Sequence, residues 1–333
     1  MKKSLVALAA LAVVGVASAQ SSVTMYGVAD VAVMKSTGSK AGGRANSVFN
    51  NGNSRLGVRG NEDLGGGLKA FFNFEQGIDL GNGNTDDSAM VTTCNAIRLV
   101  PVPTTITPVC GTASTVGTFQ RAAYVGLGGS FGEVYAGRRL GAGFYAVGTY
   151  ELTGMASYSA VVTQFGQGGP ARESASAAYT SPSFGGFTAT LGGRLASNST
   201  NNRDMIMGNL IYKQGPIAAA ASYHKVENEA RSLTLGGSYD FGMAKVAVGF
   251  YDPAVLAKGF SVGASMPLGP VVLTLDVARQ TEGFDDTDLL LEAKYALSKR
   301  TFAYAIGQRN ENGAAAPART RTNTFGMGVR HNF

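Results

Sequence analysis

The chain has 333 residues with a formal net charge of +6, and it contains 46 Gly, 2 His and no Trp. Its charged fraction of 15% lies well below the roughly 25% of ordinary soluble domains. The low charge, together with 44% hydrophobic residues, excludes a disordered chain. Two histidines also argue against a His-rich metal site or a multi-histidine catalytic centre, and the sequence indicates no cofactor.

The N-terminus has the pattern of a secretory signal peptide. Lys2 and Lys3 precede an apolar run over residues 5–17, and Ala-Ser-Ala at 17–19 forms an A-x-A cleavage site before Gln20. The apolar run is too short to cross a bilayer as a helix, and no later stretch offers 18 consecutive apolar residues. We therefore expect an exported protein with a signal peptide over residues 1–19 and a mature chain over residues 20–333.

The mature chain alternates hydrophobic and polar residues with a period of two, which is typical of β-strands. Leu273, Leu275 and Val277, for example, alternate with Thr274 and Asp276. Sixteen such runs lie near residues 22–34, 53–61, 67–79, 118–128, 132–141, 172–181, 185–197, 204–214, 216–228, 231–241, 243–252, 258–268, 270–282, 287–297, 300–311 and 320–333.

The connections between these runs alternate between short turns and longer polar loops. The short turns contain Gly, Pro, Asn or Ser, and the two longest loops cover residues 80–117 and 142–171. An even number of strands with short turns on one side and long loops on the other is the pattern of an outer-membrane barrel. A soluble β-sandwich would show similar alternation.

Two observations favour the barrel over the sandwich. Aromatic residues gather beside the short turns, as an interfacial girdle would: Tyr179, Phe187, Tyr239, Phe241, Tyr295, Phe302 and Phe333. The signal peptide fits export. We predict an all-β fold, a 16-stranded antiparallel transmembrane β-barrel with a water-filled lumen, in the outer membrane of a Gram-negative bacterium.

Several segments resemble the general porins of Gram-negative bacteria, especially the beta-proteobacterial type. They are SSVTMYGVAD at the start of the mature chain, NSRLGVRGNEDLGGGLKAFFNFEQG (53–77), RAAYVGLGGSFGEVYAGR (121–138) and GVRHNF (328–333). The resemblance implies a homotrimer of barrels with the third long loop folded into each lumen as a constriction. It also implies that Phe333 is the terminal signal read by the barrel-assembly machinery, and that outer-membrane lipid and lipopolysaccharide surround the barrel.

The alternation and the resemblance together predict the residues of the pore. Arg55 and Arg59 alternate with Leu56 and Val58, so both should face the lumen. Arginines at the positions of Arg55, Arg121 and Arg172 line one constriction wall in the resembled family.

The same alternation predicts that Arg121 faces the lumen while Ala122 and Tyr124 face outward. It also predicts that Arg172 and Glu173 lie on opposite faces of their strand. Arg194 also takes a polar face, although a solvated lumen charge is an equally good interpretation of Arg59 and Arg194. Arg138 and Arg139 are adjacent, so only one can face the lumen; Arg139 shares the parity of Glu133.

The predicted constriction loop carries one charge, Glu151, whereas porins of this family usually place more acidic residues there. Basic side chains around a pore favour anions. We therefore expect a passive channel for small hydrophilic or anionic solutes that prefers anions, with no nucleic-acid partner.

Cys94 and Cys110 lie in the other long loop, and an even pair in an exported chain predicts a disulfide over two free thiols.

Other patterns have weaker functional interpretations. Residues 128–132 match G-x-S-x-G, but they lie between two predicted strands, where a nucleophile elbow requires a following helix. The acidic residues Asp285, Asp286 and Asp288 offer oxygen ligands for calcium, although a solvated loop explains them as well. A membrane-embedded lipase or protease, and an adhesin or phage receptor acting through the long loops, are the alternative functions.

Overall fold

The computed structural model describes residues 21–38, 44–51, 53–85, 117–195, 203–283, 285–313 and 320–333. The predicted signal peptide and both cysteines lie outside these residues. The strands are β1 (Ser22–Gly38), β2 (Arg44–Asn50), β3 (Arg55–Gly65), β4 (Leu68–Gly77), β5 (Ala122–Gly129), β6 (Gly132–Leu140), β7 (Arg172–Thr180), β8 (Phe187–Arg194), β9 (Met205–Gln214), β10 (Ile217–Val226), β11 (Arg231–Asp240), β12 (Lys245–Asp252), β13 (Gly259–Leu268), β14 (Val271–Gln280), β15 (Thr287–Ala296), β16 (Thr301–Asn312) and β17 (Thr320–Asn332).

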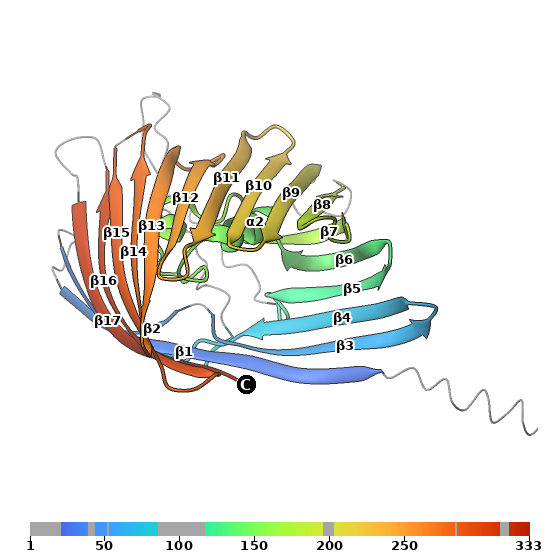
Figure 1. The fold of residues 1–333 in the computed structure, drawn as a ribbon, viewed down its shortest axis with the longest axis horizontal. Helices are drawn as coiled ribbons and strands as arrows, with labels where there is room; N and C mark the ends of the chain where they lie inside the picture. The colour runs from blue at the N-terminus through green and yellow to red at the C-terminus, as the bar shows by residue number, and fades with distance from the viewer. Residues whose placement is uncertain are drawn as a thin grey trace, which may run out of the picture.

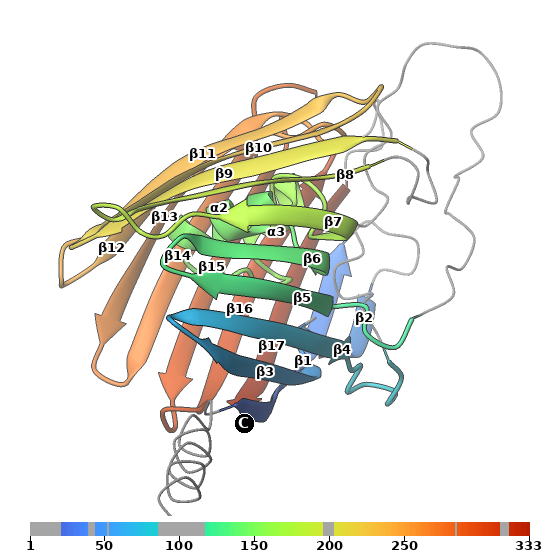
Figure 2. The same cartoon turned by 90° about the vertical axis from the view of Figure 1, so that its right-hand side faces the viewer.

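The strands form one antiparallel sheet that closes on itself as a barrel (Figures 1 and 2). From β3 onward each strand pairs with the next one along the chain, and β17 pairs with β1 to complete the circle. The barrel has sixteen strand positions, because β2 and β3 occupy one position in turn: β1 pairs with β3 over Ser22–Val28 and with β2 over Val31–Thr37. The predicted closed barrel is confirmed and the sandwich is excluded.

Segment β2 was not expected from the sequence, which predicts a strand only from residue 53. The chain there reads Arg-Ala-Asn-Ser-Val-Phe-Asn and lacks a regular alternation. It forms a strand because the long β1 offers it a free edge of backbone groups beyond the end of β3.

The period-two pattern separates an outer face from a lumen face. On β12, for example, the outward Val248 is 52% exposed and the inward Ala247 only 7%. The short turns use glycine where the backbone needs a positive φ, as at Gly215 (57°) and Gly269 (61°). Each of these glycines precedes a proline, which fixes the next backbone angle of the turn.

Residues 142–171, between β6 and β7, fold into the barrel, as expected. They contain α2 (Ala142–Tyr150) and α3 (Ala160–Phe165). Helix α2 contacts β9 to β12, and α3 contacts β14 to β16; Figure 1 shows α2 inside the curve of the sheet. Within the described ranges, no helix is long and apolar enough to cross a bilayer.

An apolar core fixes this loop to the lumen wall. Phe165 stacks on Tyr251 of β12 with ring centroids 4.6 Å apart and planes 9° apart. Val147, Tyr150 and Val161 are also at least 98% buried and belong to the same cluster. The side of the interior that faces β9 to β12 and β14 to β16 is therefore packed like a protein core.

Candidate pore constriction

Two predicted arginines meet at one carboxylate, Glu75. Arg121 Nε lies 2.8 Å from Glu75 Oε1, and Arg55 Nε lies 3.2 Å from Glu75 Oε2. Tyr26 on β1 donates its hydroxyl to the same carboxylate at 2.8 Å. Glu75 shares the inward face of β4 with Lys69 and Asn73, and the register places it opposite Gly57, two residues from Arg55 on the same face of β3. The carboxylate thus orders a pair of guanidinium groups whose combined charge exceeds its own.

Arg121 reaches this carboxylate because it lies just before β5. Its backbone N–H donates to the Glu75 carbonyl at 3.1 Å, which holds it next to β4. Because it lies outside β5, its side chain need not follow the alternation of faces in that strand. Within β5 the expected face was wrong. Tyr124 points inward, with its ring 5.9 Å from that of the buried Tyr135, whereas Val125 is 60% exposed on the outside.

Arg172, the first residue of β7, connects to the same cluster. Its Nε donates to the backbone carbonyl of Arg121 at 2.8 Å, and both side chains are largely buried. The expectation that Glu173 faces away from Arg172 was wrong. Glu173 is buried and binds His224 at 2.8 Å and Arg194 at 3.5 Å. A register shift between β6 and β7, with Ala175 at φ 50°, breaks the simple alternation at this point.

Arg139 faces the lumen and Arg138 the outside. The Arg139 guanidinium lies over the rings of Tyr124, Tyr135 and Tyr145, at 4.9, 4.5 and 5.4 Å from their centroids. Its Nε donates to the Tyr145 hydroxyl at 3.0 Å.

Tyr145 belongs to α2, so this contact joins the loop to the wall. Burial raises the pKa of Tyr145 and so keeps the phenol neutral, although the charge of Arg139 acts in the opposite direction. Arg138 instead pairs across the outer face with Ala123 and donates to Ser174 on β7.

Arg59 lies further along β3, with its guanidinium 5.0 Å from the centroid of the Tyr26 ring. The lumen wall from β3 to β8 therefore presents six arginines to the loop and the aqueous path. They are Arg55, Arg59, Arg121, Arg139, Arg172 and Arg194. Two glutamates, Glu75 and Glu173, form ion pairs with members of this set, which leaves this wall with an excess of positive charge.

Glu151 follows α2 and is 92% buried. Its carboxylate accepts hydrogen bonds from the N–H groups of Thr153 and Met155 at 3.0 and 2.7 Å. The hydroxyls of Thr153 and Ser159 also donate to it, at 2.6 and 2.8 Å. The carboxylate therefore organises the turn between the two helices, a structural use that the sequence does not reveal.

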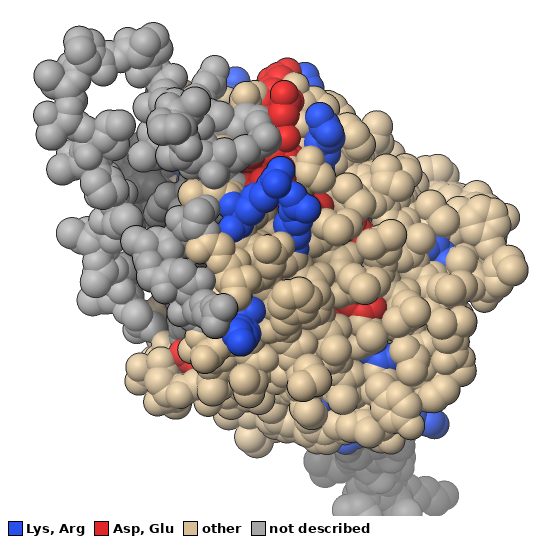
Figure 3. Space-filling model, turned by 90° about the vertical axis from the view of Figure 1, so that its left-hand side faces the viewer, with Lys and Arg blue, Asp and Glu red and all other residues tan. Residues whose placement is uncertain are grey.

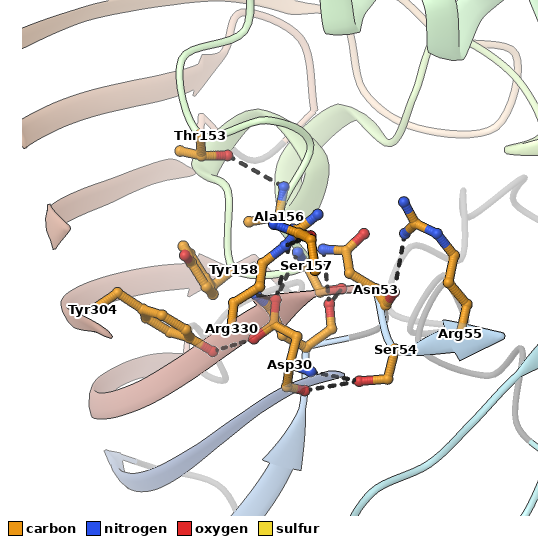
Figure 4. Close-up of polar contacts among 12 residues, drawn as sticks. Asp30, Asn53, Ser54, Arg55, Thr153, Ala156, Ser157, Tyr158, Tyr304 and Arg330 are labelled. Carbon is orange, nitrogen blue, oxygen red and sulfur yellow. Dashed lines mark hydrogen bonds and ion pairs between the residues drawn. The ribbon is translucent and has the colours of Figure 1, made fainter. Parts of the chain in front are cut away.

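Residues between β2 and β3 hold the middle of the loop (Figure 4). Ser157 donates its N–H to Asn51 Oδ1 at 3.1 Å and its hydroxyl to the Asn51 carbonyl at 2.6 Å. Asn51 in turn donates to the buried Asp30 at 3.1 Å. Asp30 also accepts from the Tyr304 hydroxyl at 2.8 Å and lies 3.7 Å from Arg330.

The anchor at Asn51 was missed because Ser157 lies 106 positions away in the chain. No local pattern reports such contacts.

The C-terminal Phe333 completes the barrel seam. Its N–H and carbonyl pair with the carbonyl and N–H of Gly27, both at 3.0 Å. The side chain lies over Gly27, where an added Cβ would come within 2.2 Å of the ring.

The acidic residues after β14 have protein partners. Asp288 accepts from Thr163 and Asn310 at 2.8 Å each, and Asp286 accepts from the N–H of Gly313 at 2.5 Å. Asp288 thereby ties α3 to the wall. Among the described residues, no group of three or more His, Cys, Asp or Glu side chains is arranged to hold a metal ion.

Comparison with known proteins gives a consistent family. A family model described as Gram-negative porin matches residues 5–315. The outer membrane porin protein 32 of Delftia acidovorans is 31% identical over 91% of this chain and 88% of its own length. An outer membrane porin protein of Bordetella pertussis is 27% identical over the whole of both chains.

Solved structures agree with these relatives. An anion-selective porin from Comamonas acidovorans superposes with a TM-score of 0.70 at 25% identity, covering 94% of this chain and 100% of its own. OmpT of Vibrio cholerae, at 14% identity and a TM-score of 0.64, shares the fold over 94% of this chain and 98% of its own.

Proposed function

The chain belongs to the family of Gram-negative porins and is a channel of the outer membrane. On this premise, we propose that its pore passes small hydrophilic solutes and prefers anions. The observation that carries the preference is the lumen wall from β3 to β8, where six arginines share ion pairs with two glutamates and the Lys69–Glu133 pair adds no net charge. A positive wall in a narrow aqueous path attracts anions and repels cations. The relative from Comamonas acidovorans described as an anion-selective porin is consistent with this proposal.

The proposed constriction consists of Arg55, Arg59, Arg121, Arg139 and Arg172. Glu151 belongs to the facing loop, where its carboxylate is buried and holds the turn between α2 and α3. Glu75 joins this set as the counter-ion that spaces Arg55 and Arg121. The preference should be graded, because much of the charge is already balanced by Glu75 and Glu173.

The test is the reversal potential of purified protein in a planar bilayer under a KCl gradient. Arg121→Ala should lower the anion-to-cation permeability ratio by about threefold at low salt, as expected for one unit charge beside the path. Arg138→Ala is the matched control, because Arg138 is on the same hairpin but faces outward. A wild-type pore that selects cations at low salt would refute the proposal.

Assembly and processing remain proposals as well. We propose cleavage before Gln20, a Cys94–Cys110 disulfide, a homotrimer, and recognition of Phe333 by the barrel-assembly machinery. An exported chain supports the disulfide, and closed symmetry would cover the outer wall in a trimer.

No catalytic role is proposed. The G-x-S-x-G match is a tight turn at Ser130–Phe131 between β5 and β6, and a strand follows it where a nucleophile elbow requires a helix.

A further inference from the structure

The outer wall has a hollow over β14 to β17. On β16 three consecutive outward positions are Ala303, Ala305 and Gly307, so no side chain there extends beyond Cβ. The neighbouring strands present Tyr295 on one side and Met327 on the other, which are 47% and 72% exposed. They border an open hollow of about 460 Å³, which we call the β16 trough; its outward-facing lining residues are Val271, Ala293, Tyr295, Ala303, Ala305, Met327 and Val329.

The trough lies on the membrane-facing surface. Figure 3 shows this side of the molecule as mostly uncharged, with the densest group of basic and acidic residues toward the top of the view and single charged residues elsewhere on the face. Neighbouring strands lie about 4.8 Å apart and residues rise about 3.3 Å along a strand. The lining residues of the trough span β14 to β17 across the wall and two residue rises along β16, so the trough is a short apolar depression with the small residues Ala303 and Ala305 at its floor. It is open toward the lipid and has room for part of an acyl chain.

A cationic turn stands at one end of the trough. Lys299 and Arg300 connect β15 to β16, and both are exposed. Among the described residues, neither forms an ion pair with an acidic side chain. The short turns at residues 129–131, 181–186 and 268–270 on the same side carry no charge, whereas the turn between β11 and β12 is flanked by Asp240 and Lys245. Short turns of such barrels face the periplasm, so these two cations lie at the level of the headgroups of the periplasmic leaflet.

The backbone of this turn is fixed. Ser298 accepts hydrogen bonds at its hydroxyl from the N–H groups of Arg300 and Thr301, at 3.1 and 3.0 Å. The Arg300 carbonyl accepts from the N–H of Asn332 at 2.8 Å. The two cations therefore project from a defined position directly beyond the trough.

From this juxtaposition we propose that the β16 trough and the Lys299–Arg300 turn bind one anionic glycerophospholipid of the periplasmic leaflet. An acyl chain lies along Ala303 and Ala305, and the phosphate pairs with Lys299 and Arg300. Tyr295 lines the trough near the turn, at the depth where aromatic side chains accompany lipid headgroups. A second copy of the chain is the competing occupant, but it would have to bring acidic groups to the turn as well as apolar groups to the trough.

The test uses the full-length folded protein in vesicles of equal parts phosphatidylglycerol and phosphatidylcholine. After mild detergent extraction, the phospholipids retained per protein are counted by mass spectrometry. The wild type should retain phosphatidylglycerol over phosphatidylcholine by roughly fivefold or more, since each cation near a membrane surface contributes about that factor.

Two variants separate the parts of the site. Lys299→Gln with Arg300→Gln should bring the lipid ratio close to one, and Ala305→Leu should lower the number of lipids retained. Ala221→Leu is the matched control, because Ala221 faces outward on β10, away from the trough. Equal retention of both lipids by the wild type would overturn the proposal. So would an Ala305→Leu variant that changes oligomeric mass but not lipid content.

Discussion

Replacing Glu75 by Gln should raise the anion preference of the pore. The carboxylate lies 2.8 Å from Arg121 Nε and 3.2 Å from Arg55 Nε, so its removal uncovers one unit of positive charge at the wall. Glutamine has nearly the same shape and keeps an oxygen that can accept from Tyr26, which now donates at 2.8 Å. The substitution therefore changes charge with little change in packing.

The size of the effect follows from Coulomb's law. An ion passing about 7 Å from a unit charge in water has an interaction energy of about 0.6 kcal/mol. That energy changes occupancy by about 2.7-fold, in opposite directions for anions and cations, so the permeability ratio changes by about sevenfold. Screening at 0.1 M salt, with a Debye length of about 10 Å, reduces this to about threefold, and at 1 M almost nothing remains.

The assay is the reversal potential under a KCl gradient, measured at both salt concentrations. Glu133→Gln is the control: its carboxylate pairs with Lys69 at 2.9 Å, but both side chains are far more exposed than Glu75 and Arg121. It should change the ratio less. An unchanged or lower ratio for folded Glu75→Gln at low salt would refute the reasoning that this wall sets the selectivity.

Two further predictions concern the loop. Burial and then Glu292 raise the pKa of Tyr158, so its contribution to stability should be constant below the ordinary tyrosine pKa of about 10 and fall above it, because only the unfolded phenol ionises. Thermal midpoints in detergent should fall less steeply with pH in Tyr158→Phe, and parallel curves would contradict this. Asn51→Ala removes the side-chain acceptor of the Ser157 N–H and should speed chymotrypsin cleavage of the loop severalfold, whereas a cleavage rate equal to wild type would show that the loop is held elsewhere.

The sequence predicts the barrel well because the environment alternates with the strand. One face meets lipid and the other meets water or the loop, so Arg55 and Arg59 are assigned to the lumen from parity alone. Parity fails at strand ends and bulges. Arg121 precedes its strand, and the shift between β6 and β7 brings Glu173 to the lumen beside Arg194.

The partners of the site are harder to predict than its faces. Glu75 is recognisable as an inward residue, but its contact with Arg121 depends on residues 46 positions apart in the chain. The anchor from Ser157 to Asn51 spans 106 positions, and β2 forms only because β1 extends beyond β3. Such contacts depend on barrel closure, which no short segment encodes.

The seam between β1 and β17 also has a consequence for the order of folding. The other strands pair with strands that are nearer in the chain, whereas β1 pairs with β17 and Gly27 forms its hydrogen bonds with Phe333. Closing so long a loop costs conformational entropy before the hydrogen bonds of the seam form, and contacts of this sequence separation slow folding. Until closure, β1 and β17 expose unpaired edges that promote aggregation. We therefore expect closure to be the slow step of refolding, and substitutions at the seam to change folding yield more than the properties of pores that have already formed.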